Sequence, residues 1–69
     1  MTNEYYSNAS DAIAASIHHD IIARVPETAE NTGYLKGLCD SSVVTEEETE
    51  YWGTDENGYD WRVHAVTED

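Results

Sequence analysis

Apolar residues recur at helical spacing through the first third of the chain. Ile13, Ile17 and Ile21 are four residues apart, and smaller apolar residues widen the same stripe. This spacing places one apolar face along a helix and predicts an amphipathic helix over residues 8–25. Pro26 is expected to end it, because the residue before a proline is pushed away from helical geometry.

A weaker helical pattern follows Pro26. Its apolar positions are Tyr34, Leu35, Leu38 and Cys39. Two glycines interrupt these positions, so the pattern favours only a short helix over residues 28–39. Ser41 and Ser42 then predict a loop.

The last third of the chain is typical of a β-hairpin. Residues 43–54 and 59–67 form the two arms, and the connection 55–58 contains Asn57 and Gly58. These two residue types tolerate the positive φ that a hairpin turn requires.

The two arms differ in the side chains they place on each face. In the second arm, one alternating set is apolar and is expected to face the helices: Tyr59, Trp61, Val63 and Ala65. In the first arm, one face is predicted to be a row of carboxylates that ends in an aromatic residue: Glu46, Glu48, Glu50 and Trp52.

Together these elements predict a single α+β domain over residues 1–69. An N-terminal amphipathic helix and a short second helix are expected to pack on a small antiparallel sheet, the C-terminal hairpin. A lone hairpin is marginal, so a third strand from near the N-terminus or from 34–38 is an option. The expected core is Ile13, Ile17, Ile21, Val25, Leu35, Leu38, Tyr51, Trp61, Val63 and Ala65.

Charge narrows the possible functions. Fifteen Asp and Glu against three Lys and Arg give a net charge of -12. Such a chain is repelled by phosphate backbones and anionic lipid, so direct binding to nucleic acid or membrane is not expected, whereas a basic protein surface is its natural complement. The N-terminus has no positive region followed by an apolar one, which predicts a cytoplasmic protein.

Candidate catalytic and metal-binding groups are sparse. His18 and His19 are adjacent and point about 100° apart on a helix, and no spacing joins either one to His64 as metal ligands. Cys39 is the only cysteine and lies on the apolar side of the second predicted helix. The acidic groups stand in solvated runs, where no carboxyl has the apolar pocket that general acid catalysis needs. We therefore expect no enzyme, cofactor or metal site.

The acidic row instead predicts a protein-binding surface. Alternate strand residues are about 6.6 Å apart, close to the roughly 7 Å between successive phosphates that rise about 3.4 Å along a DNA strand. The row of Glu46, Glu48 and Glu50 therefore approximates three phosphates. Three acids extend the negative surface around the turn: Asp55, Glu56 and Asp60. Trp52 on the same face is of the type enriched in interface hot spots.

In size, acidity and lack of catalytic motifs, the whole chain resembles the small phage-encoded anti-CRISPR proteins. Several of these act as acidic decoys on the DNA-binding surfaces of CRISPR effectors. The resemblance implies a stoichiometric inhibitor that mimics DNA in the bacterial host cytoplasm, with a type I surveillance complex as the favoured target.

Other functions are also compatible with the acidic composition. An anti-restriction DNA mimic would use the same acidic surface on a different enzyme. A small interaction domain of a salt-adapted organism would be acidic for solvation alone, and it should unfold at low salt. An antitoxin-like partner of one basic toxin is a further alternative.

Overall fold

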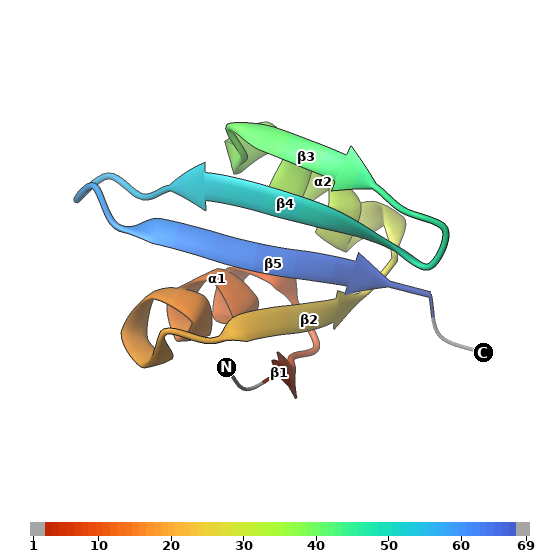
Figure 1. The fold of residues 1–69 in the computed structure, drawn as a ribbon, viewed down its shortest axis with the longest axis horizontal. Coiled ribbons are helices and arrows are strands. Elements are labelled where there is room, and N and C mark those ends of the chain that lie inside the picture. Colours follow the sequence, from red (N-terminus) through yellow and green to blue (C-terminus); the bar gives the residue numbers. More distant parts are fainter. Residues whose placement is uncertain (1–2, 68–69) are drawn as a thin grey trace.

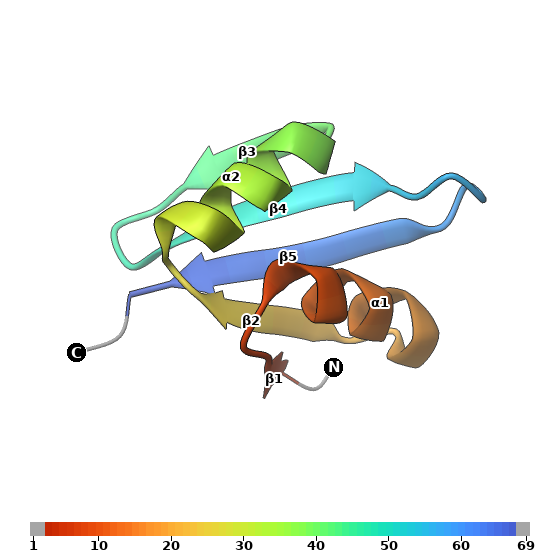
Figure 2. The ribbon, with the colours of Figure 1, turned by 180° about the vertical axis from the view of Figure 1, so that it is seen from behind.

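In the part of the chain that the structure describes, five strands form one mixed sheet, and both helices lie on the same face of it (Figures 1 and 2). The computed structural model describes residues 3–67. The strands are β1 (Asn3–Tyr5), β2 (Ile22–Pro26), β3 (Ser41–Val44), β4 (Glu48–Thr54) and β5 (Asp60–Val66); the helices are α1 (Ala9–His19) and α2 (Ala29–Leu38). The predicted α+β class, with two helices on a sheet, is confirmed.

The sheet is larger than a hairpin and is only partly antiparallel. Its order is β1-β2-β5-β4-β3. The pairs β1–β2 and β2–β5 are parallel, whereas β4 pairs antiparallel with both β5 and β3. The extra strand from the N-terminus is therefore present, and residues 34–38 belong to α2 instead.

The predicted hairpin is confirmed as the antiparallel pair of β4 and β5, but its first arm is shorter than the expected 43–54, because residues 43–44 belong to β3 and 45–47 connect the two strands. The hairpin turn is organised by one carboxylate. Asp55 Oδ1 accepts hydrogen bonds from the backbone N–H groups of Asn57 (2.9 Å) and Tyr59 (2.8 Å). Gly58 adopts a φ of 87°, a conformation that glycine reaches without steric cost. Tyr59, which was expected to face the helices, is exposed because it belongs to this turn.

The prediction of one helix over residues 8–25 is wrong for its last six residues, 20–25. α1 ends at His19, and Asp20 takes a left-handed conformation with a φ of 52°. Residues 22–26 are strand β2, in which Ala23 and Val25 are fully buried. Branched side chains and a period of two favour a strand here. In the sequence, the isoleucines at every fourth position favoured a helix over this strand period of two.

The buried face of α1 consists of small residues rather than the expected isoleucines. Ala9, Ala12, Ala15 and Ser16 are buried, while Ile13 and Ile17 are only partly buried at the margin of the core. Small side chains allow a helix axis to approach the sheet closely. Ser16 is close enough for its Oγ to accept a hydrogen bond from the backbone N–H of Arg62 in β5 (2.9 Å).

The second predicted helix is confirmed as α2, with Thr28 as its N-cap. Of its apolar residues, Leu35 is fully buried, but Leu38 is 51% exposed and is not the core residue that was expected. The predicted loop at Ser41 and Ser42 is wrong, because both residues lie in β3 and pair with β4. Serine is tolerated there because β3 is an edge strand whose four residues are all exposed.

One buried amide joins the two helices to the sheet. Asn31 in α2 accepts a hydrogen bond from the Ala9 N–H at the start of α1 (3.1 Å). Its Nδ2 donates to the carbonyls of Ser7 (3.3 Å) and Pro26 (3.1 Å). Buried polar groups are stable when they are paired in this way, so Asn31 fixes where α1 begins relative to the end of β2.

Gly53 and Trp61 face each other across the β4–β5 ladder, under the helices. A Cβ at Gly53 would lie 2.5 Å from Cε2 of the Trp61 indole. We expect Gly53→Ala to destabilise the protein by about 1–3 kcal/mol, the usual cost of overpacking. The measurement is the urea midpoint. Gly33→Ala is the control, because a Cβ there meets nothing within 4 Å and alanine favours the helix. Equal midpoints for the two variants would contradict this packing.

Burial raises the pKa of the Tyr51 phenol above its ordinary value of 10.0, and the charges of Cys39 and Glu27 act in the same direction. The unfolded chain therefore loses this proton at lower pH than the folded protein, and stability that is present below pH 10 is lost as the pH rises. We expect the urea midpoint to fall more steeply between about pH 9 and 11 for the wild type than for Tyr51→Phe. Equal pH dependence of the urea midpoint in the two proteins would show that Tyr51 does not contribute to the loss of stability at high pH.

Candidate functional site

The helices cover only one face of the sheet, and the side chains of the other face are the candidate site. This open face carries the alternate residues that point away from the helices. One row of directly paired residues crosses all five strands: Tyr5, Arg24, His64, Glu50 and Val43. The neighbouring pairs add Glu48 beside Val66 and Trp52 beside Arg62.

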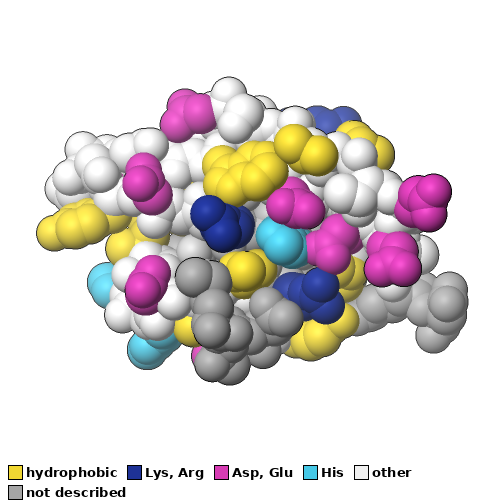
Figure 3. Space-filling model, in the orientation of Figure 1, with side chains coloured by type: hydrophobic (Ala, Val, Ile, Leu, Met, Phe, Trp, Pro, Cys, Tyr) yellow, Lys and Arg dark blue, Asp and Glu magenta, His cyan; other side chains and the backbone are white. Residues whose placement is uncertain are grey.

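Four charged or titratable side chains meet at the middle of the open face. We call them the open-face cluster: Arg24, Glu48, Glu50 and His64. They come from three adjacent strands, β2, β5 and β4. Figure 3 shows a histidine side chain near the middle of this face, with acidic and basic side chains around it and further acidic side chains towards both ends.

Glu48 has the most contacts in the open-face cluster. Arg24 Nη2 donates to Glu48 Oε1 at 2.9 Å, and the same nitrogen lies 3.5 Å from Oε2. His64 Nδ1 lies 2.5 Å from Glu48 Oε2, and His64 Nε2 lies 3.6 Å from Glu50 Oε1. The Glu48 and His64 side chains are only 15% and 11% exposed, so water screens the Glu48 charge less than it screens the charge of a surface group.

The structure differs from the predicted row of three carboxylates. Glu48 and Glu50 do lie side by side on β4, but Glu46 belongs to the connection between β3 and β4. That connection is closed by Thr45, whose Oγ1 donates to the Glu48 carbonyl (2.8 Å) and accepts from the Glu48 N–H (3.1 Å). The tight turn removes Glu46 from the strand. A straight, free row of three phosphate-like charges is therefore not present.

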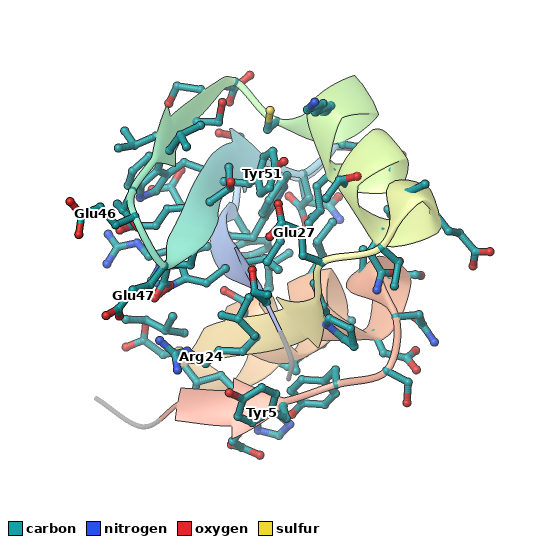
Figure 4. The ribbon with its side chains drawn as sticks, turned by 90° about the vertical axis from the view of Figure 1, so that its right-hand side faces the viewer. Tyr5, Arg24, Glu27, Glu46, Glu47 and Tyr51 are labelled. Carbon is teal, nitrogen blue, oxygen red and sulfur yellow. The ribbon has the colours of Figure 1, made fainter. Side chains whose placement is uncertain are left out.

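Further acids lie towards the two ends of β4. Glu46 and Glu47 are exposed at one end, and Figure 4 shows both projecting on the side away from the helices. At the other end Asp60 lies on the open face, where its Oδ1 is 3.4 Å from Thr54 Oγ1, and Asp40 Oδ2 is 3.2 Å from the same hydroxyl. The seven residues of β4 span about 20 Å between these groups.

Three predicted contact residues differ in accessibility. Glu56 is exposed at the tip of the turn, whereas Asp55 is partly buried and its carboxylate organises that turn. Asp55 is therefore structural. Trp52 is partly buried, and with Arg62, Asp40 and Asp60 it lines a hollow that also includes Ser16 and Asp20 from the end of α1.

The other groups weighed from the sequence lie away from the open-face cluster. His18 and His19 are exposed in the last turn of α1, where positive charge suits the helix dipole. Cys39 is a partly buried free thiol, and its Sγ lies 3.8 Å from the Lys36 carbonyl. Neither histidine nor the thiol contributes to the open face.

Tyr6 has a raised phenol pKa, caused first by its partial burial and then by the nearby Glu4 carboxylate. Its hydroxyl donates to Glu4 Oε1 at 3.3 Å. This pair lies at the N-terminal edge of the sheet, outside the open-face cluster.

Comparison with known proteins identifies no relative: no family model, curated protein or solved structure matches the chain. Among the described residues, neither helix has the length and apolar character needed to cross a membrane.

The contacts of Glu48 predict a difference between two neighbouring acids. Glu48→Gln removes the charge that binds Arg24 and lies beside His64, so we expect a loss of about 1–3 kcal/mol in the free energy of unfolding. Glu46→Gln removes an exposed charge and should change stability by no more than about 0.5 kcal/mol. Urea unfolding of both variants is the measurement. Equal stabilities would show that the open-face cluster does not contribute to the fold.

Proposed function

We propose that this protein is a non-enzymatic inhibitor that occupies the basic, DNA-binding surface of another protein. The observation that carries the proposal is the distribution of charge on the open face. Exposed acids stand towards both ends of β4, and the open-face cluster between them is nearly balanced. The mimicry therefore rests on two acidic groups about 20 Å apart, the axial length of about six phosphates of one DNA strand, instead of on a continuous row.

Apolar and aromatic side chains accompany the charges on the open face. Val43 is 48% exposed on the edge strand β3, and Tyr5 is 61% exposed on the opposite edge strand β1. Trp52 is partly buried on β4, and aromatic residues are enriched in protein interfaces. In this arrangement the aromatic and apolar side chains make the contact, while the acids at the ends accelerate association with a basic partner and reject acidic ones.

The partner class follows from the charge. A net charge of -12 favours a lysine- and arginine-rich groove that holds nucleic acid, and a CRISPR effector complex in the bacterial cytoplasm is the first candidate because of the resemblance noted from the sequence. A restriction enzyme offers the same kind of groove and is the alternative.

Competition with DNA tests the proposal directly. A purified type I CRISPR surveillance complex and a type I restriction enzyme are each incubated with fluorescent target DNA, and displacement by the protein is followed by anisotropy. We expect displacement from one of them at near-stoichiometric concentration. The effect should weaken as salt is raised, because it depends on charge.

Two variants with equal net charge test whether inhibition depends on the acids of the open face or only on the overall negative charge. Glu46→Gln, Glu47→Gln and Asp60→Asn together neutralise the two ends of the open face, and we expect at least about a tenfold loss of inhibition, or 1.4 kcal/mol. Glu4→Gln, Glu27→Gln and Glu30→Gln remove the same charge from other surfaces and should preserve inhibition. Equal inhibition by the two variants, or no displacement from either enzyme by the wild type, would refute the proposal.

A further inference from the structure

The open-face cluster contains a donor set that the proposed function does not use. Glu48, Glu50 and His64 each offer one ligand atom, and these three atoms lie within 4.8 Å of one another. Two are carboxylate oxygens from alternate residues of β4, and the third is an imidazole nitrogen from the neighbouring strand β5. A single cation can contact atoms separated in this way.

His64 provides a second, independent observation. The residue is only 9% exposed, and both ring nitrogens are buried without a hydrogen-bond partner, although each faces a glutamate carboxylate. Buried polar atoms are nearly always paired. In its neutral form the imidazole has one N–H and one lone pair, so one nitrogen then directs its lone pair at a carboxylate. A cation bound to that nitrogen and to the carboxylate that it faces removes this repulsion.

We propose that Glu48, Glu50 and His64 bind a divalent first-row transition cation, with Zn²⁺ as the reference ion. Imidazole nitrogen and carboxylate oxygen are both zinc ligands, and three protein ligands leave a fourth position for water. The Glu50 side chain is 28% exposed, so this donor set is open to water. The ion would join β4 to β5 at the centre of the open face.

Arg24 has a supporting role in this site. Its guanidinium donates mainly to Glu48 Oε1 at 2.9 Å, while Glu48 Oε2 is the oxygen nearest to His64 Nδ1. Hydrogen-bonded outer partners of this kind orient metal-binding carboxylates. Arg24 and Arg62 add positive charge to the open face, but the net charge of -12 makes the protein as a whole attractive to cations.

Metal titration of the full chain tests the site. Isothermal titration with Zn²⁺ at about pH 7.5, where protons compete little with the metal for imidazole, should give one ion per chain. Thermal unfolding should shift to higher temperature, because an ion that binds only the folded state stabilises it. Co²⁺ should give visible absorption bands that disappear when Zn²⁺ is added. The absence of binding by the folded wild type would overturn the proposal.

Matched variants locate the ion. We expect Glu50→Gln, at a partly exposed position, to keep the fold and weaken Zn²⁺ binding about tenfold or more, and His64→Gln to abolish it. Circular dichroism reports whether each variant is folded. The combined variant His18→Gln, His19→Gln and Cys39→Ser should bind like the wild type. Unchanged binding in Glu50→Gln, or loss of binding in the combined variant, would place the ion elsewhere and refute the site.

The metal site and the proposed inhibitor function can be refuted independently of each other. The metal titration needs no protein partner, and the variant with Glu46, Glu47 and Asp60 neutralised retains all three ligands, so it should bind Zn²⁺ normally. Loss of zinc binding in that folded variant would contradict the assignment of the ligands. A negative DNA competition experiment says nothing against the metal site.

Discussion

The pairing of β4 with β5 is the interaction on which the rest of the structure depends. Its seven directly opposed residue pairs place Tyr51 and Val63 under the helices and Glu50 and His64 on the opposite face. Successive side chains of a strand point to opposite faces of the sheet, so the same register places both the buried pair and the open-face pair. A slip of one residue would expose the core and bury the charges, so the register that forms the core also assembles the open-face cluster.

Two features place the rest of the molecule around this ladder. The alanine face of α1 lets the helix approach the sheet until Ser16 bonds to the backbone of β5, and Asn31 ties the starts of both helices to the end of β2. Neither feature adds much apolar area. In a chain with only eleven Ile, Leu and Val residues, close approach and satisfied polar groups supplement a small core.

The large negative charge is distributed so that little of it opposes folding. Self-repulsion destabilises a compact acidic protein, yet the two strand glutamates nearest the centre of the sheet lie beside Arg24 and His64. Most other described acids are in turns, helix ends and the connection between β3 and β4, where water screens them. This arrangement leaves a nearly balanced centre and acidic ends on one face, which is the basis of both proposals.

Local chemistry in the sequence determined the β4–β5 hairpin, its turn at Gly58, helix α2 and the start of α1, because caps, turn residues and strand alternation act over a few neighbours. Only tertiary structure decided that residues 22–26 form a strand and that Ser41 and Ser42 pair at an edge. It also decided that Glu48 and Glu50 meet His64 and Arg24 while Glu46 does not. The contacts of the two glutamates with Arg24 and His64 join residues 14 to 24 positions apart, so they depend on strand order and register. The spacing of residues along the chain does not indicate strand order or register.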